Sequence, residues 1–107
     1  MEFEYKIKNN EVTITNHKGT SKDVIIPNTI ENVSVTTIGE YAFYGNKLTS
    51  IVLPKTLTTI GRGAFCNNEL TSIVLPKTLT TIGNGAFEEN KLTSIVLPET
   101  LTTIGNY

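Results

Sequence analysis

The chain has 107 residues, of which 38% are hydrophobic and 18% charged, and its formal net charge is −1. This length allows one domain with a core, and the balance of 9 Lys+Arg against 10 Asp+Glu disfavours electrostatic binding of nucleic acid. The single cysteine excludes an internal disulfide and a thiolate metal cluster, and no apolar run is long enough to insert into a membrane as a helix. The first residues lack the pattern of a signal peptide, so we expect either an intracellular protein or a chain that begins after processing.

The N-terminal part predicts a β-hairpin over residues 2–16. Apolar and polar residues alternate there, as in half-buried strands, with the apolar positions at Phe3, Tyr5, Ile7, Val12 and Ile14. Asn9 and Asn10 form a good turn dipeptide between the two strands. We expect the hairpin to cover the exposed end of the fold that residues 23–107 form. His17 falls in the polar stretch 16–20 and is typical of a surface residue; a metal role would need several more ligands.

A repeat of 22 residues occupies the rest of the chain. The copies at 38–59, 60–81 and 82–103 differ pairwise at five positions, and residues 104–107 open a fourth copy. Residues 24–30 match residues 51–57 and form a weaker copy with five extra residues, 31–35. We therefore divide the chain into an N-terminal capping module, residues 1–37, and three regular repeats plus the start of a fourth, residues 38–107.

The middle copy shows what one unit must look like. Residues 71–75 are β-branched and alternate, which predicts a strand with Ile73 and Leu75 inward and Val74 outward. Residues 78–82 form a second extended run, and Gly83 permits a sharp turn. Residues 85–87 are compatible with one helical or 3₁₀ turn.

Stacked units can bury apolar residues that one unit cannot. The fold expected is mainly β: a solenoid with a parallel β-ladder, short helical or 3₁₀ turns and an N-terminal hairpin cap. Its layers would be Leu48/Leu70/Leu92, Ile51/Ile73/Ile95, Leu53/Leu75/Leu97 and Phe43/Phe65/Phe87. An asparagine column, Asn46/Asn68/Asn90, can bond backbone groups left unpaired at the corners.

The pattern Leu-x-x-Ile-x-Leu-Pro-x-x-Leu-x-x-Ile-Gly-x-x-Ala-Phe-x-x-Asn resembles the BspA-type leucine-rich repeat over residues 23–107. The family often has cysteine at the positions of Asn46, Asn68 and Asn90, and Cys66 does not fill that role. The resemblance implies a curved solenoid of bacterial surface proteins, several of them adhesins, and carries over no catalytic residue. It thus implies an extracellular or cell-surface location, with a cytoplasmic one still open.

We expect a non-catalytic protein–protein interaction module, without a cofactor, whose partner is a protein such as a host or matrix protein. The outward positions of the Thr-Ser-x-Val-x-x-Lys/Glu segment make up the candidate binding face: Thr49, Ser50, Val52, Lys55, Thr71, Ser72, Val74, Lys77, Thr93, Ser94, Val96 and Glu99. The alternative is a structural or consensus-built scaffold with no ligand. Ice binding through Thr-x-Thr rows is a minor alternative, since threonine also stacks well in sheets. The last coil has no closing cap in the sequence, so we expect the chain either to be a fragment of a longer protein or to self-associate through this coil.

For two further features the sequence predicts a structural role rather than a chemical one. Cys66 shares a column with Tyr44 and Glu88, which predicts an exposed or half-exposed thiol without a base beside it. Tyr41 and Tyr44 either form a small aromatic patch or help to close the first coil.

Overall fold

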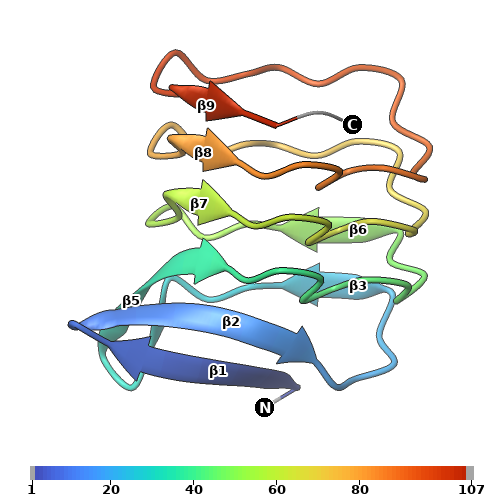
Figure 1. Ribbon diagram of the computed structural model, residues 1–107. Coiled ribbons are helices and arrows are strands. Elements are labelled where there is room, and N and C mark those ends of the chain that lie inside the picture. Colours follow the sequence, from blue (N-terminus) through green and yellow to red (C-terminus); the bar gives the residue numbers. More distant parts are fainter. Residues whose placement is uncertain (1, 106–107) are drawn as a thin grey trace.

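The copies stack coaxially, because each 22-residue unit can bury its apolar layer only against its neighbour. The computed structural model describes residues 2–105, and successive coils lie one above another from the N-terminal hairpin to the last copy (Figure 1). The described part is mainly β and contains no helix. The predicted solenoid is confirmed.

A parallel sheet runs along one side of the stack. Its strand order is β1-β2-β5-β7-β8-β9, with β1 antiparallel to β2. The strands are β1 (Phe3–Lys8), β2 (Glu11–His17), β5 (Val33–Ile38), β7 (Thr59–Ile60), β8 (Thr81–Ile82) and β9 (Thr103–Ile104). Ile38, Ile60, Ile82 and Ile104 pair in turn, so the repeat of the sequence is also the register of the sheet.

One short strand completes the degenerate first copy. β4 (Thr29–Ile30) pairs antiparallel with β5, and Glu31 and Asn32 make the turn between them with φ of 54° and 63°. Positive φ at both central residues is the geometry of a tight hairpin. The extra residues of the degenerate copy therefore become a second small hairpin. β5 runs from Val33 to Ile38 and so continues past residue 37, where we place the end of the capping module. The division of the chain into a capping module and regular repeats stays a prediction.

The N-terminal hairpin has the predicted turn, with Asn9 and Asn10 at φ of 53° and 62°. Val12 and Ile14 on β2 are fully buried against the first coil. The expectation for His17 was wrong: it ends β2, is 6% exposed, and stacks on Phe43 with ring centroids 5.2 Å apart. A flat ring is needed there because the hairpin must cover the end of the phenylalanine column.

The core is a set of layers that repeat from coil to coil. Phe43 and Phe65 stack at 5.3 Å, and Phe65 and Phe87 stack at 5.7 Å with nearly parallel rings. Leu48 and Leu70 are fully buried, and the equivalent residues of the other layers in the first two regular copies are also buried. The predicted layers are confirmed there. Aromatic pairs at these separations add stabilisation beyond the area that they bury.

The asparagine column satisfies the backbone at one corner, as the sequence predicts. Asn68 Oδ1 accepts hydrogen bonds from the backbone N–H groups of Asn46 and Leu48, both at 3.0 Å. Its Nδ2 donates to the carbonyl oxygens of Phe43 and Phe65 at 2.8 and 2.9 Å. One buried side chain therefore ties two coils together through four backbone groups.

The glycines of the turns have roles that differ from those expected. A Cβ on Gly83 would lie 2.5 Å from the backbone N of Arg62, so this glycine permits close approach of coils rather than a sharp turn. Gly63 has φ of +60° and belongs to two overlapping turns, in which Ala64 N donates to Gly61 O and Cys66 N donates to Gly63 O. The single turn expected at residues 85–87 is present as an i→i+3 hydrogen bond from Glu88 N to Gly85 O, and the left-handed Gly85 at its start keeps it from belonging to a longer helix.

The predicted strand at 71–75 is only partly present. In the first regular copy, β6 (Ser50–Val52) pairs in parallel with β3 (Asp23–Ile25). Residues 71–75 and 93–97 are not strands, and within the described residues no backbone–backbone hydrogen bond joins them to a neighbouring coil. The alternation nevertheless holds, since Ile73 is 9% exposed and Val74 is 84% exposed. Just after this segment a threonine side chain joins the coils, since Thr78 Oγ1 donates to the carbonyl oxygens of Lys55 and Leu57.

Replacing Asn68 by alanine should destabilise the fold more than replacing Asn46. Asn68→Ala leaves four buried backbone groups without partners, for an expected loss of about 3 kcal/mol. The side chain of Asn46 bonds Tyr44 O and the ring of His17, so Asn46→Ala should cost about 1 kcal/mol. Urea unfolding followed by circular dichroism measures both values. Equal losses would contradict the role given to the buried corner.

Candidate functional site

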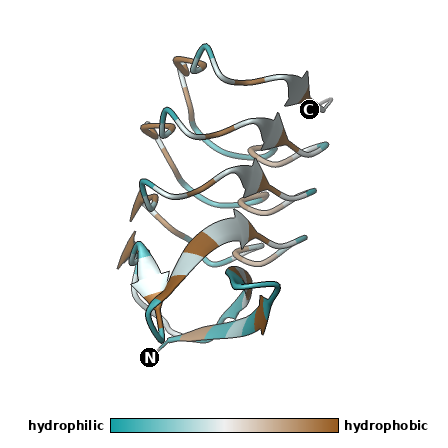
Figure 2. Ribbon diagram, turned by 90° about the vertical axis from the view of Figure 1, so that its left-hand side faces the viewer, coloured by the Kyte–Doolittle hydropathy of each residue, from teal (hydrophilic) through white to brown (hydrophobic). Residues whose placement is uncertain are grey.

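One side of the stack carries exposed branched apolar side chains in a single column. We call this column, Ile25, Val52, Val74 and Val96, the valine column. Ile25 pairs directly with Val52 in the β3–β6 sheet, and the other two follow by the repeat. Their side chains are 73%, 55%, 84% and 84% exposed. The segments that carry them lie on the side of the coils opposite β7, β8 and β9 (Figure 2).

Hydroxyl groups flank the valine column on every regular coil. Thr49 Oγ1 and Ser50 Oγ both donate to Asp23 Oδ1, at 3.1 and 2.7 Å. The equivalent residues of the next two copies are exposed and make no hydrogen bond in the part of the chain that the structure describes: Thr71, Ser72, Thr93 and Ser94. These hydroxyls can therefore bond a partner.

Asp23 was missed by the sequence analysis, although it is the only aspartate in the chain. It stands opposite Ser50 in the β3–β6 pairing, where the regular copies have serine. The hydrogen bonds from Ser50 and then Thr49 lower the pKa of its carboxyl group. The alignment of the degenerate copy with residues 50–52 was the signal that could have found it.

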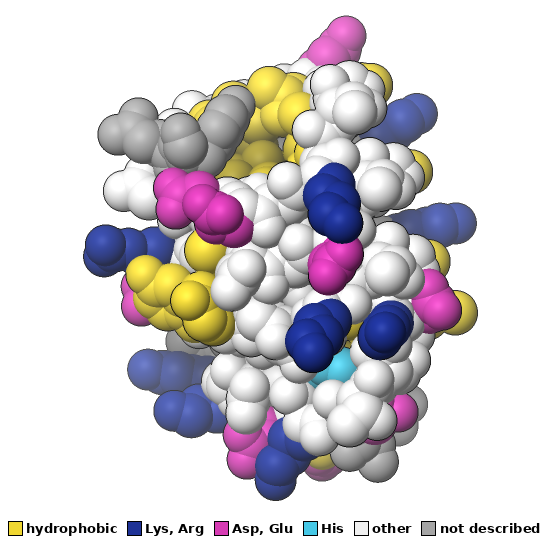
Figure 3. Space-filling view, turned by 90° about the vertical axis from the view of Figure 1, so that its right-hand side faces the viewer, with side chains coloured by type: hydrophobic (Ala, Val, Ile, Leu, Met, Phe, Trp, Pro, Cys, Tyr) yellow, Lys and Arg dark blue, Asp and Glu magenta, His cyan; other side chains and the backbone are white. Residues whose placement is uncertain are grey.

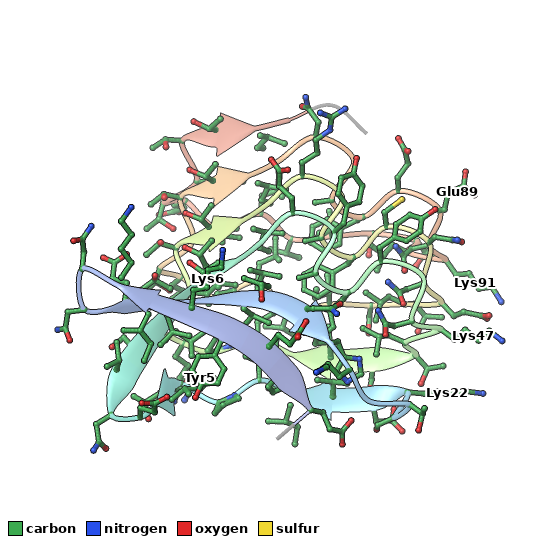
Figure 4. All side chains as sticks on the ribbon, turned by 60° about the horizontal axis from the view of Figure 1, so that its bottom comes forward. Tyr5, Lys6, Lys22, Lys47, Glu89 and Lys91 are labelled. Atoms are coloured by element: carbon green, nitrogen blue, oxygen red, sulfur yellow. The ribbon has the colours of Figure 1, made fainter. Side chains whose placement is uncertain are left out.

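Charged side chains border the face at both ends of each segment. At one corner Lys91 Nζ lies 2.9 Å from Glu69 Oε1, and the hydrogen bond and charge of Lys91, followed by the charges of Lys22 and Lys47, lower the pKa of Glu69. Lys22, Lys47 and Lys91 project to the same side of the stack (Figure 4). The other end of each segment carries Lys55, Lys77 and Glu99, all exposed.

The structure thus places all the sequence-predicted site residues along one arc of the coils. Thr49, Ser50, Val52 and Lys55 follow one another on the first regular copy, and the second and third copies repeat the order. Hydrophobic side chains protrude along the right-hand edge of Figure 3, beside the lysine and acidic side chains that lie nearer the middle of the view. The binding role of these residues stays a prediction.

The Thr-x-Thr rows face the stack itself. Thr58 Oγ1 donates to Thr36 O, Thr80 Oγ1 to Thr58 O and Thr102 Oγ1 to Thr80 O. Leu57 and Leu79 between the threonines are fully buried, as predicted. Since these hydroxyl hydrogens are already donated to backbone carbonyls, the rows hold coils together, which argues against ice binding through them.

The remaining candidates lie on the turns. Cys66 is half-buried, and burial followed by the charges of Glu88 and Glu89 raises the pKa of its thiol, which disfavours a nucleophilic thiolate. Tyr41 and Tyr44 are about half exposed and meet edge to face at 5.8 Å. Within residues 2–105, no three His, Cys, Asp or Glu side chains come together as a metal site, and no helix there could cross a membrane.

The last copy is more exposed than the others. Leu97 and Ile104 are 42% and 45% exposed, whereas their equivalents Leu75 and Ile82 are 8% and 2% exposed. Leu92, Ile95 and Leu97 line a hollow of about 300 Å³, and Figure 3 shows hydrophobic side chains in a hollow near the top of the view. Asn106 and Tyr107 lie outside the described residues.

Substituting Ser50 should move the titration of Asp23. In Ser50→Ala the pKa of Asp23 should rise toward the ordinary value of about 3.9, because the main hydrogen bond to the carboxylate is gone. With its pKa lowered in the folded state, Asp23 adds stability above its ordinary pKa, and this contribution is lost as the pH falls through the folded-state pKa. Carboxyl-carbon NMR titration measures the shift. Ser72→Ala is the control and should leave Asp23 unchanged; an unmoved pKa in Ser50→Ala would refute the assignment.

Known proteins resemble this chain in both sequence and fold. The family profile described as BspA type leucine rich repeat region (6 copies) matches residues 16–107. No curated protein matches the chain. Solved structures do match it, among them three that are described as leucine-rich proteins.

The leucine-rich repeat protein of T. pallidum is 27% identical, with a TM-score of 0.73 over 97% of this chain and 62% of its own. A leucine-rich cell surface protein of Faecalibacterium prausnitzii A2-165 is 27% identical, with a TM-score of 0.82 over 96% of this chain and 31% of its own. A leucine-rich repeat protein of Bacteroides ovatus ATCC 8483 is 28% identical, with a TM-score of 0.67 over 98% of this chain and 36% of its own. The chain thus spans less than two thirds of the length of each of these proteins.

The profile match covers most of the chain, and the parallel stack has the architecture of these solved structures. The chain therefore belongs to the BspA-type leucine-rich repeat family.

Proposed function

We propose that the chain is a non-catalytic protein-interaction module, an adhesin-like domain of a bacterial cell-surface protein, that binds its partner through the valine column and the residues beside it. The observation that carries this proposal is the exposure of Val74 and Val96, at 84% each, in line with Val52 and Ile25. Covering one such side chain is worth roughly 1.5–3 kcal/mol, so a partner that covers several gains substantially. Contiguous exposed apolar residues with a polar rim are typical of protein-binding surfaces.

Membership of the family supports the general part of this proposal, which is a protein-interaction module without catalytic activity. Leucine-rich repeat proteins of this type are generally interaction modules and typically non-enzymatic scaffolds. One structural neighbour is described as a cell surface protein, which supports an extracellular or cell-surface location. A host or matrix protein is the class of partner that follows from such a location.

The geometry of the face also favours a protein over a small molecule. The valine column is a row of similar contacts repeated from coil to coil, whereas a small-molecule pocket needs distinct polar groups that converge. The hydroxyls of Thr71, Ser72, Thr93 and Ser94 add hydrogen-bonding capacity along the same row. Such a surface fits a partner that runs along the stack.

Substitutions on the valine column and on the hydroxyl residues beside it should weaken partner binding without unfolding the protein. Val74→Arg, at a side chain that is 84% exposed, should weaken capture of the partner at least about tenfold. Ser72→Arg should also weaken it, because the long side chain stands beside the same contact. Pull-down against matrix and host proteins, followed by titration of the captured protein, measures the loss.

Tyr44→Arg is the matched control, since it changes a side chain that is 51% exposed on a turn away from the valine column. It should leave capture unchanged. If Val74→Arg and Ser72→Arg both bind as the parent chain does, the face is wrong. If the parent chain captures nothing, the alternative of a structural scaffold without a ligand is favoured.

Self-association through the last coil is a separate prediction. Leu97 and Ile104 are 42% and 45% exposed in the described structure, so a second copy could cover them. Sedimentation velocity should show an average mass that rises with concentration, and Leu97→Glu should suppress the rise. A monomer at every concentration would count against pairing through this end.

A further inference from the structure

A groove crosses the candidate face between the first and second regular copies. Its floor is made by Ile51, Leu53, Leu75 and Pro76, and its rims carry Val52 and Val74. Its volume is about 530 Å³, which is large enough for one or two side chains of a partner. The groove lies where β6 pairs with β3 on one side but, among the described residues, has no paired strand on the other.

Two lysines stand at one end of this groove. Lys55 and Lys77 belong to its lining, and no acidic residue does. Thr78 Oγ1 donates to Lys55 O at 3.0 Å, which places the two lysines on adjoining turns of the chain. Neither ammonium group forms an ion pair within the described residues. Two neighbouring like charges without counter-charges favour an anionic partner group between them.

The charge distribution of the chain strengthens this preference. The candidate face and its borders carry five lysines, Lys22, Lys47, Lys55, Lys77 and Lys91, against Asp23, Glu69, Glu89 and Glu99. The face therefore carries a formal +1 in a chain of formal net charge −1, which leaves −2 for the rest. The lysines at the groove are thus part of a locally positive surface on an acidic protein.

The side chains of the groove make it suited to an extended chain. Val52 and Val74 are 55% and 84% exposed, whereas Leu53 and Leu75 in the same lining are each 8% exposed, so protruding and recessed apolar side chains alternate. An extended peptide also presents alternate side chains to one face, so one of them can enter the recess.

We propose that this groove binds an extended segment of the partner that carries branched apolar side chains next to carboxylates. One apolar side chain rests on Leu53 and Leu75 between Val52 and Val74, and a carboxylate lies against Lys55 and Lys77. The inference rests on the proposed function and names the chemistry of the partner segment. The third copy has Glu99 in the lysine column, so the preference for an acidic segment is local to the first two regular copies.

The test uses the 107-residue chain and three fluorescein-labelled peptide probes. These are an alternating Glu/Val peptide of nine residues, its Lys/Val counterpart and its Glu/Ser counterpart. Fluorescence anisotropy at low salt should show at least about tenfold tighter binding of the Glu/Val probe than of either other probe. Amide NMR shifts on binding should centre on residues 51–55 and 73–78.

Charge reversal at the groove provides the decisive comparison. The double variant Lys55→Glu/Lys77→Glu should lose the preference for the Glu/Val probe and bind the Lys/Val probe better. Lys6→Glu/Lys8→Glu changes the net charge equally on β1, at the bottom of the stack (Figure 4), and should keep the parent preference.

Three outcomes would overturn the inference: no binding of the Glu/Val probe up to millimolar concentration, equal effects of the two double variants, or amide shifts centred elsewhere. The proposed function fails separately. If Val74→Arg abolishes capture of a protein partner while Lys55→Glu/Lys77→Glu leaves it intact, the interaction face stands and the acidic segment does not.

Discussion

The structure depends on one constraint: each coil must lie at hydrogen-bonding distance from the next along two sides of its path. Thr37, Thr59, Thr81 and Thr103 pair in turn along one side. On the turns, Phe43 N donates to Ala64 O and Phe65 N to Ala86 O, both at 2.8 Å. This spacing brings the phenylalanine rings into stacking contact and puts the asparagine side chains within reach of two coils at once. The extra residues of the degenerate copy leave this spacing intact because they fold out as the β4–β5 hairpin, and the pairings of β3 with β6 and of β5 with β7 continue on either side.

Identical sequence does not give identical surroundings in such a stack. Asn46, Asn68 and Asn90 share a column, and both Asn68 and Asn90 bond backbone groups of two coils, yet of these three only Asn68 is buried. Asn46 meets His17 instead, because the hairpin takes the place of a preceding coil. Leu75 and Leu97 likewise have the same sequence neighbours and very different exposure. Position in the stack therefore decides how much each copy contributes to stability.

Much of this fold could be predicted from the sequence, because the repeat sets both period and register. The inward positions, the asparagine column and the Asn9–Asn10 turn follow from alternation and turn chemistry, and the structure has them. Pairing between coils does not follow from alternation alone. Residues 71–75 alternate as a strand does but lack a paired neighbour, whereas the short Thr-Ile pairs at 59–60 and 81–82 form the sheet. His17 was missed for a similar reason: its burial comes from Phe43, which is distant in sequence.

The same distinction separates what could be predicted of the candidate site from what could not. The outward face follows from the alternation, but the partners of Asp23 and the groove beside Lys55 and Lys77 arise from how coils meet. Two sides of each coil use their backbone polar groups for stacking, so a partner there would compete with the bonds that hold the fold. Residues 71–75 and 93–97 do not, and a partner can bind them without opening a ladder.

Repetition on this face also raises a problem of register. A ligand that contacted only Thr, Ser and Val would meet the same chemistry on each regular copy and could slide by one coil. The residues that break the repeat remove this degeneracy: Asp23 holds the hydroxyls of the first regular copy, and the lysine column ends at Glu99. In the proposed complex, uniform apolar contacts would supply affinity along the stack, while the charges that differ from coil to coil would fix where along it a partner binds.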